Sequence, residues 1–376
     1  MHPAPDLLCF SHLQWDLVFQ RPQHLLTRAA ATRRVFYWEE PAWTDLPHPH
    51  TAARLAHGVR IFQPRLPTPL WHDGGVAAQR TLLDQALAEY RIASPILWYY
   101  TPRALPFSAH LPAAAAVYDC MDELSLFANA DPELPALEND LLRRADLVFT
   151  GGASLYAAKR SRHPRTHLFP SGVDPAHFLP ARQPLPDPAD QSTLPRPRLG
   201  YYGVLDERLD LPLLARLCDL RPAYQFILLG PIAKITPADL PQRPNLHWLG
   251  PKPYPALPAY LANWDAALMP FAVNSATRFI SPTKTPEYLA AGRPVIATPI
   301  TDVASTYGPA NGVRIAATPQ AFADACDQAL AQPPLWRPAA DALLATMAWS
   351  EIWSRMDALL TAALQPRPAT YPHIAA

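Results

Sequence analysis

The sequence predicts an α/β protein with two doubly wound, Rossmann-like domains that face each other across a cleft. Short apolar runs rich in Val, Ile, Phe and Tyr alternate with helical patterns along most of the 376 residues. This alternation is typical of parallel sheets covered by helices on both faces. It stops once, at residues 179–197, LPARQPLPDPADQSTLPRP, which are rich in proline and lack apolar periodicity. Such composition is typical of a linker between two domains.

The first predicted domain covers residues 1–178. Its apolar runs predict strands at residues 7–11, 35–40, 59–64, 96–100, 116–121, 147–151 and 167–172. Helical patterns such as RPQHLLTRAA and QRTLLDQALAEY separate these runs. Because a helix in the crossover lets the chain return in the same direction, we expect consecutive strands to be parallel.

The second predicted domain covers residues 198–350, with strands expected at residues 198–204, 225–230, 246–250, 266–271, 294–299 and 313–316. Near its end, the run WSEIWSRMDALLTAAL has an apolar face at helical spacing. That face consists of Trp349, Ile352, Trp353, Met356 and Leu360. We expect residues 351–376 to form a helix and tail that cross back to the first domain.

Composition excludes several classes of protein. Lys plus Arg equals Asp plus Glu at 32 each, whereas a general nucleic-acid binder normally has a basic excess. No apolar run is long enough to span a membrane, and the start MHPAPDLLCFSH lacks the segments of a signal peptide. We therefore expect a cytoplasmic protein. HExxH, Cys/His and DxD patterns are missing, so the sequence predicts no metal site, and the missing GxGxxG argues against a dinucleotide oxidoreductase.

The four lysines stand out because arginine supplies nearly all other positive charge. Lys234, Lys252 and Lys284 each follow a predicted strand of the second domain, and Lys159 lies in the first. Ligands of open parallel sheets bind beyond the carboxyl ends of the strands. Three lysines there predict an anion site for a phosphate or diphosphate, although charged residues also gather in loops for solubility alone.

The run SPTKTPEYLAAG adds to this prediction. Either Ser281 with Pro282 or Thr285 with Pro286 is expected to begin a helix, which Gly292 then ends. The amino end of that helix attracts anions, and Lys284 and Arg278 add charge. Glu287 can accept hydrogen bonds from the vicinal hydroxyls of a ribose. The alternative for Glu287 is a partner of the helix dipole.

Three segments of the chain resemble a known family. The run KTPEYLAAGRPVIATP is similar to the donor-site motif of GT-B glycosyltransferases, in particular the large bacterial family of polysaccharide and lipid glycosyltransferases. HLFPSGVDPAHF resembles the segment that closes the first domain of that family, and RLGYYGVLDERLD resembles the first strand and loop of its second domain. The resemblance implies a metal-independent enzyme without a cofactor. It also implies transfer of a sugar from a nucleotide-diphospho-sugar, held by the second domain, to a surface-polysaccharide or lipid-linked acceptor, held by the first.

The resemblance also implies roles for individual residues. Glu287 holds the ribose, and Lys284, Arg278 and Arg208 hold the diphosphate. The remaining donor-site residues are Gly203, Ser281, Thr283, Lys234, Lys252 and Tyr254, with residues 252–254 framing the nucleobase.

Two positions depart from the family. Phe279 stands where a glutamate is common, and Val204 stands where an arginine is usual, with Arg208 as a substitute. These departures leave two alternatives open, a nucleotide-sugar epimerase of the same fold and a catalytically silent glycosyltransferase-like binding subunit.

An inverting transfer needs a base that removes a proton from the acceptor hydroxyl. The candidates are His12, after the first strand, and Asp119 and Asp122, at the end of the strand at residues 116–121. Because parallel strands end at one edge of the sheet, a His12–Asp119 dyad is expected as one arrangement. A helix N-cap is the alternative for each aspartate, and a structural role or contact with the acceptor is the alternative for His12.

The run AAKRSRHPRTH, which contains Lys159, carries several basic side chains. It predicts contact with anionic lipid headgroups at the inner face of the membrane or with a lipid-diphosphate acceptor. A solvated helix end is the alternative.

Overall fold

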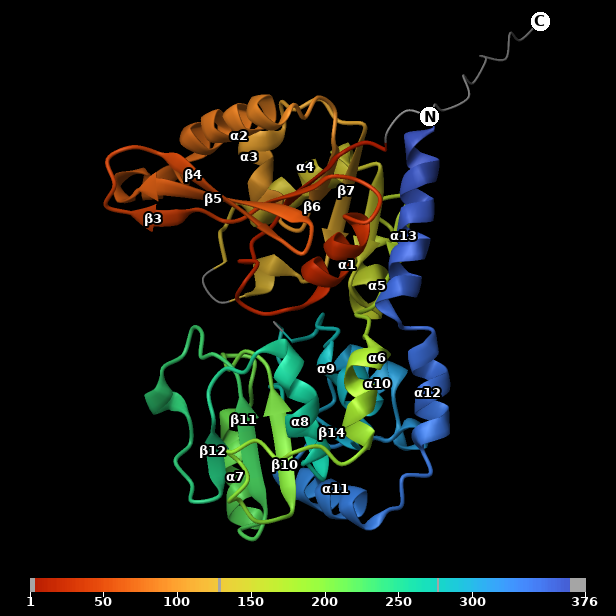
Figure 1. Cartoon of the computed structure of the whole chain (residues 1–376). Helices are drawn as coiled ribbons and strands as arrows, with labels where there is room; N and C mark the ends of the chain where they lie inside the picture. Colours follow the sequence, from red (N-terminus) through yellow and green to blue (C-terminus); the bar gives the residue numbers. More distant parts are fainter. Residues whose placement is uncertain (1–3, 128–129, 276, 366–376) are drawn as a thin grey trace, which may run out of the picture.

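A computed structural model describes residues 4–127, 130–275 and 277–365 of the chain. The first half forms a nine-stranded sheet and the second half a six-stranded sheet. Figure 1 shows the two units one above the other, each with helices around its sheet. Within the described residues, all strand pairs are parallel except β4–β5. The α/β fold class that the sequence predicts is therefore confirmed.

The first sheet has the strand order β3-β5-β2-β1-β6-β7-β8-β9, and β4 also pairs with β5. Its strands are β1 Leu7–Phe10, β2 Val35–Trp38, β3 Ala42–Thr44, β4 His50–Ala56, β5 Val59–Pro67, β6 Ile96–Tyr99, β7 Ala115–Cys120, β8 Leu147–Thr150 and β9 Thr166–Leu168. The helices of this half are α1 Arg21–Ala29, α2 Val76–Tyr90, α3 Leu105–Ser108, α4 Leu134–Arg144, α5 Ala153–Lys159 and α6 Pro175–Phe178.

The second sheet has the order β12-β11-β10-β13-β14-β15. Its strands are β10 Arg198–Tyr202, β11 Gln225–Leu229, β12 Leu246–Trp248, β13 Ala266–Met269, β14 Val295–Ala297 and β15 Val313–Ile315. The helices of this half are α7 Leu211–Leu220, α8 Leu257–Ala262, α9 Lys284–Ala290, α10 Thr301–Thr306, α11 Pro319–Ala331, α12 Arg337–Ala345 and α13 Trp349–Leu364.

Every strand that the sequence predicts is present, and two further strands, β3 and β4, are not predicted by it. β4 pairs antiparallel with β5 as a hairpin at the edge of the sheet. His57 and Gly58, both at positive φ (50° and 79°), form its two-residue turn, as such hairpins require. The β4 sequence HTAARLA contains few β-branched or aromatic residues and is partly exposed, so it lacks the apolar run that marks a buried strand.

The last helix, α13, returns to the first sheet. Its apolar face lies in one core cluster with β1, α1 and β8, and Figure 1 shows it running alongside the first unit. A second cluster fills the other face of the same sheet, under α2 and α4. The domain boundaries that we assigned from the sequence stay a prediction.

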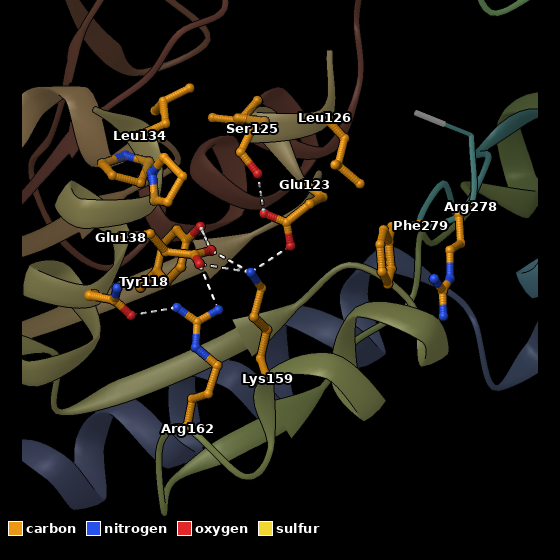
Figure 2. A pocket seen from close by; sticks show the side chains of 14 residues that line it. Tyr118, Glu123, Ser125, Leu126, Leu134, Glu138, Lys159, Arg162, Arg278 and Phe279 are labelled. Carbon is orange, nitrogen blue, oxygen red and sulfur yellow. Dashed lines mark hydrogen bonds and ion pairs between the residues drawn. The ribbon is translucent and has the colours of Figure 1, made fainter. Parts of the chain in front are cut away.

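Lys159 is buried, contrary to a role in contacting a membrane. Its ammonium pairs with Glu123 (2.5 Å) and Glu138 (2.6 Å) inside a pocket that residues of both units line (Figure 2). Arg162 pairs with Glu138 as well, at 2.7 Å. A lysine that is 1% exposed needs such carboxylate partners, so Lys159 points inward, whereas Arg162 is paired but exposed. Among the described helices, none is long and apolar enough to cross a membrane.

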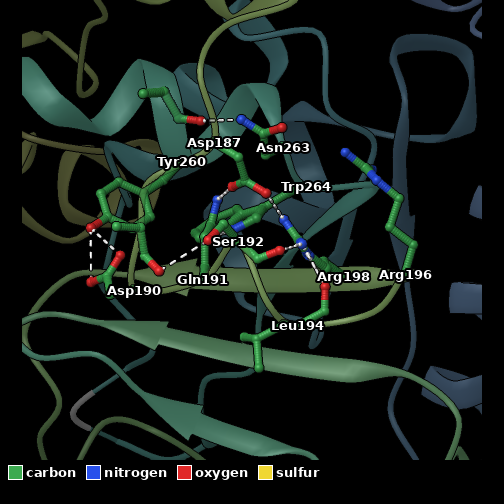
Figure 3. A network of polar contacts seen from close by, with 12 residues as sticks. Asp187, Asp190, Gln191, Ser192, Leu194, Arg196, Arg198, Tyr260, Asn263 and Trp264 are labelled. Atoms are coloured by element: carbon green, nitrogen blue, oxygen red, sulfur yellow. Dashed lines mark hydrogen bonds and ion pairs between the residues drawn. The ribbon is translucent and has the colours of Figure 1, made fainter.

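The proline-rich residues 179–197 are packed against the second unit. Gln191 is fully buried and accepts a hydrogen bond from Trp264 Nε1 at 3.1 Å. Asp187 accepts from Gln191 (2.8 Å) and from Arg198 (2.6 Å), as Figure 3 shows. The composition predicts a linker, and the structure shows that side chains of this segment fasten it along β10 and α8.

Candidate active site

A cavity of about 440 Å³ lies between the two units, at the carboxyl ends of the strands of the second sheet. From the first unit, residues 15–20 and His57 line this interdomain cavity. From the second unit, the ends of β10 and β11, residues 251–254 and the start of α9 line it. The predicted donor-site residues in its wall are Gly203, Lys252, Tyr254, Thr283, Lys284 and Glu287.

Two glycines shape the sheet edge of the cavity. Gly203 and Gly230 follow β10 and β11 and adopt φ of 145° and 143°, values that side chains disfavour. A Cβ on Gly203 would lie 2.1 Å from Lys284 Cε, and one on Gly230 would lie 1.7 Å from the Gly203 carbonyl oxygen. Only glycine fits at these two strand ends, because Lys284 and the Gly203 carbonyl approach the backbone this closely. Gly203 is predicted from the sequence, whereas Gly230 is not, although the run LLG ends a strand in the same way.

Glu287 lies in the cavity wall and is only 4% exposed. The Tyr202 hydroxyl donates a hydrogen bond to Glu287 Oε2 at 2.5 Å. Burial raises the pKa of Glu287 to about 7, while the Tyr202 hydrogen bond and the Lys284 charge oppose this rise. The fixed carboxylate keeps Oε1 for a ligand hydroxyl. Tyr202 is missed by the sequence analysis, although it directly precedes Gly203.

Lys284 presents its ammonium to the cavity. No hydrogen bond or ion pair to Nζ occurs within the described part of the chain, and burial lowers the pKa of this ammonium, with Arg208 acting in the same direction. Helix α9 begins at Lys284, with Thr283 as N-cap. Neither Ser281 with Pro282 nor Thr285 with Pro286 starts the helix. Pro286 instead occupies the first turn, where no backbone donor is needed.

The helix ends as the sequence predicts. Gly292 adopts a φ of 74° directly after the C-cap Ala291, the left-handed conformation that closes many helices.

The other predicted cations have partners outside the cavity. Lys234 pairs with Glu207 at 2.9 Å, and Lys252, although in the cavity wall, pairs with Asp190 at 2.7 Å. Arg208 forms a bidentate pair with Asp206, with Nη2–Oδ2 at 2.6 Å. Of the three lysines predicted to converge on one anion, Lys284 and Lys252 line the cavity and Lys234 does not. Convergence on an anion stays a prediction for Lys252, whose charge Asp190 partly compensates.

Arg278 and Ser281 lie beside the cavity and do not line it. The Arg278 guanidinium covers the Phe279 ring at 5.2 Å, in the pocket of Lys159 (Figure 2). The Ser281 carbonyl accepts a hydrogen bond from the Ser171 hydroxyl at 2.6 Å. Arg278 therefore does not contribute charge to the anion site, and Ser281 joins the two units.

The second half of the chain matches a known family. Residues 196–332 match the model of glycosyl transferases group 1. These residues form a glycosyl transferases group 1 domain. The putative teichuronic acid biosynthesis glycosyltransferase TuaH of Bacillus subtilis (strain 168) is 25% identical over 218 residues. This alignment covers 54% of the chain and 55% of TuaH.

Solved structures establish the fold of the whole chain. Sucrose-phosphate synthase from Thermosynechococcus elongatus superimposes with a TM-score of 0.71 at 17% identity, over 95% of this chain and 98% of that one. The E. coli trehalose-6-phosphate structure with UDP-2-fluoro glucose superimposes with a TM-score of 0.70 at 15% identity, over 96% of this chain and 100% of that one. Anabaena HepE with UDP and glucose superimposes with a TM-score of 0.69 at 15% identity, over 94% of this chain and 99% of that one. The chain has the GT-B fold, with the group 1 domain as its second half.

On the side facing the group 1 domain, the predicted His12–Asp119 dyad is not formed. Asp119 is fully buried and receives hydrogen bonds from Arg21 Nη2 (2.8 Å) and Nε (3.1 Å). Arg21 also donates to the Phe169 carbonyl at 2.8 Å. Its oxygens are taken up by this buried guanidinium, so Asp119 serves to fix Arg21 and not to orient His12. The N-cap alternative does not hold either, because Asp119 lies within β7.

His12 and Asp122 face charges of the group 1 domain. Burial, helped by the Lys234 charge and opposed by a hydrogen bond with the Tyr100 backbone, lowers the pKa of His12 to about 4. The imidazole is therefore neutral at pH 7. Burial raises the pKa of Asp122 to about 6, while Arg208 and Lys234 oppose that rise. A carboxylate with this pKa is a better base near neutrality than such a histidine. The short helix after Asp122 has Glu123 as N-cap, so Asp122 is not a cap.

Proposed function

We propose that the protein is a glycosyltransferase that moves a sugar from a nucleoside-diphosphate donor to the hydroxyl of a surface-polysaccharide acceptor. The observation that carries this proposal is the interdomain cavity, where two groups lie at glycine-ended strands. These are the fixed carboxylate of Glu287 and the ammonium of Lys284, which has no ion-pair partner among the described residues. A carboxylate for vicinal hydroxyls beside a cation for phosphates suits a nucleoside diphosphate. The names of TuaH and of the UDP-bound neighbours support this donor and acceptor class.

An aromatic part of the cavity wall suits a nucleobase. The Phe19 and Tyr254 rings stack with centroids 5.0 Å apart, one from each unit. Flat aromatic surfaces there offer apolar contact to a planar ring. We propose that Glu287 accepts hydrogen bonds from the ribose hydroxyls and that Lys284 compensates the diphosphate charge. With the Lys284 ammonium close to the departing diphosphate, we propose that transfer requires no metal ion.

In the transfer step, the acceptor oxygen forms a bond to the anomeric carbon while the bond from that carbon to the diphosphate oxygen breaks. The electron pair leaves with the diphosphate, whose negative charge Lys284 stabilises. In an inverting transfer, Asp122 takes the proton of the acceptor hydroxyl. Because the cavity walls come from both units, donor binding holds them together and limits access of water.

The test is product analysis by mass spectrometry of UDP-glucose and UDP-N-acetylglucosamine, incubated with and without a panel of oligosaccharides. A glycosylated oligosaccharide with released UDP supports the proposal. Isomerised donor without an acceptor indicates an epimerase of the same fold. Intact donor in every mixture contradicts transfer and indicates a binding subunit.

The pH profile tests the role of Asp122. With a pKa of about 6, log kcat/KM is expected to rise with pH up to about 6 and then level off. Asp122→Asn is expected to lose this limb and to lower kcat about 100-fold or more. An unchanged limb in Asp122→Asn, with the protein folded, would assign the base elsewhere.

A further inference from the structure

A second cavity, of about 880 Å³, lies wholly within the first unit. It occupies the carboxyl edge of the first sheet, at the ends of β1 and β2 and beside β3. The start of α2 and residues 131–133 close its other sides. We call it the N-terminal cavity. None of its lining residues lines the interdomain cavity.

Two tryptophans stand at this cavity. The Trp43 and Trp71 rings meet edge to face, with centroids 5.0 Å apart at 61°. Trp71 is 61% exposed, and it lies in the 3-10 helix Thr68–Asp73. Exposed aromatic rings that rim a cavity indicate a binding surface. The flat apolar C–H faces of a sugar ring pack on such indole faces.

The charge of the N-terminal cavity is negative. Its wall contains five carboxylates, from Glu39, Glu40, Asp73, Asp131 and Glu133. Arg103 is the one lysine or arginine among the lining residues, and it lies 3.7 Å from Asp131. Like charges confined in a cavity repel an anion. The carboxylates accept hydrogen bonds, which sugar hydroxyls and amino groups donate.

Glu39 links the two cavities. It is 1% exposed, and Oε1 accepts hydrogen bonds from the Trp15 backbone (2.7 Å) and from Arg54 (2.9 Å). Its Oε2 is buried and has no partner in the part of the chain that is described. A buried unpaired carboxylate oxygen is costly and signals a missing donor. Trp15 lines the interdomain cavity, so Glu39 joins the wall of the N-terminal cavity to the backbone of a residue at the proposed donor site.

We infer that the N-terminal cavity binds the acceptor and that this acceptor ends in an uncharged or amino-bearing saccharide. Trp71 and Trp43 stack on a sugar ring, and Glu39 and the other carboxylates accept its hydroxyl or amino protons. That the bound saccharide is the acceptor rests on the proposed function. That the cavity binds a saccharide rests on the residues of the cavity alone. An acceptor whose bound sugar carries a carboxylate or a phosphate is excluded by the wall charge. The diphosphate of a lipid-diphosphate acceptor is excluded from the cavity in the same way.

The experiment measures quenching of tryptophan fluorescence, with and without UDP. The probes are trisaccharides of glucose, mannose, galactose, rhamnose, N-acetylglucosamine, glucosamine and galacturonate, together with farnesyl diphosphate. We expect at least one neutral or amino trisaccharide to bind 10-fold or more tightly than trigalacturonate and farnesyl diphosphate. Trp71→Ala is expected to weaken that binding at least 10-fold, with Trp71→Phe between it and the wild type. Leu335→Ala, at a site 84% exposed on the other unit, is the control.

A charge variant tests the exclusion of anions. Glu40→Gln with Glu133→Gln removes two exposed carboxylates of the wall. We expect this double variant to narrow the preference for neutral over anionic trisaccharide by several-fold, chiefly at low salt.

The outcomes separate the two proposals. Saccharide binding without any nucleotide binding supports the cavity and contradicts the proposed function. Nucleotide binding or transfer without saccharide binding, equal binding in Trp71→Ala, or a preference for trigalacturonate or farnesyl diphosphate overturns this inference and leaves the donor site intact.

Discussion

At the residue scale, the surroundings of Glu287 determine both the orientation and the pKa of its carboxyl group. Tyr202 fixes one carboxylate oxygen, and burial raises the pKa of the carboxyl to about 7. The carboxylate of the free protein is thus partly protonated near neutrality. Ligand hydroxyls that donate to it favour the ionised form, so nucleotide binding is expected to release protons at pH 7.

The first prediction concerns stability. Because the folded pKa of Glu287 is raised, its contribution to stability is fully present below pH 4.5 and is lost as pH rises through about 7. Glu287→Gln removes the ionisation. The wild type should therefore lose stability between pH 5 and pH 8 that Glu287→Gln keeps. We expect the difference in free energy of unfolding, Glu287→Gln minus wild type, to increase by roughly 1–3 kcal/mol over this range. Urea unfolding at both pH values measures this difference, and an equal difference at the two would contradict the assigned pKa.

The local sequence is enough to single out Glu287 and Lys284 as candidates, because both lie in one motif that forms a single turn of α9. Asp119 fails as a candidate for the opposite reason. Its partner Arg21 lies 98 residues away in the sequence, and no local pattern indicates which of several polar residues at a strand end meets a buried guanidinium. Tyr202 is missed because a tyrosine in an apolar strand cannot be distinguished, by sequence, from a residue of the hydrophobic core.

At the element scale, the buried strands are predictable because both of their faces are covered, and this leaves apolar runs. The exposed hairpin strand β4 has no such run and is missed. The start of α9 is misplaced because two Ser/Thr-Pro pairs both fit a helix start, and only tertiary packing selects Lys284. The strand-end glycines shape the edge of the proposed donor site, since their backbone conformation excludes a Cβ.

The second prediction addresses this edge. Gly230→Ala places a Cβ against the Gly203 carbonyl at a φ of 143°. We expect it to lower the free energy of unfolding by roughly 2–4 kcal/mol and to weaken nucleotide binding. Gly308→Ala is the matched control, because its Cβ meets nothing within 4 Å and its φ of −164° is extended. Similar thermal unfolding of the two variants would contradict the importance of this edge.

At the scale of the whole molecule, polar contacts hold the two units around the interdomain cavity. Asp302 of α10 accepts a hydrogen bond from the Ser154 backbone N–H at 3.0 Å, at the start of α5. Gly152 lies so close that a Cβ there would be 2.0 Å from Asp302 Oδ2. A second hydrogen bond between the units runs from the Ser171 hydroxyl to the Ser281 carbonyl. We expect these contacts to favour the closed arrangement in which both walls meet the donor.

The third prediction is that Asp302→Ala favours separation of the units. Loss of one buried hydrogen bond costs about 1 kcal/mol, which shifts a closed–open equilibrium roughly fivefold. We expect a larger radius of gyration in small-angle scattering without nucleotide and a lower kcat/KM. Thr306→Ala on the same helix is the control. An unchanged radius and unchanged kinetics would show that Asp302 does not hold the units together.

The most direct test of the central claim is calorimetric titration of UDP and of uridine into the wild type, Glu287→Gln, Lys284→Met and Lys234→Met. If Glu287 holds the ribose and Lys284 the diphosphate, Glu287→Gln weakens both ligands, whereas Lys284→Met weakens UDP about 10-fold or more and leaves uridine unchanged. Lys234→Met, whose lysine already has a carboxylate partner, binds UDP like the wild type. Absence of UDP binding to the wild type, or equal affinities in all four proteins, would contradict the account.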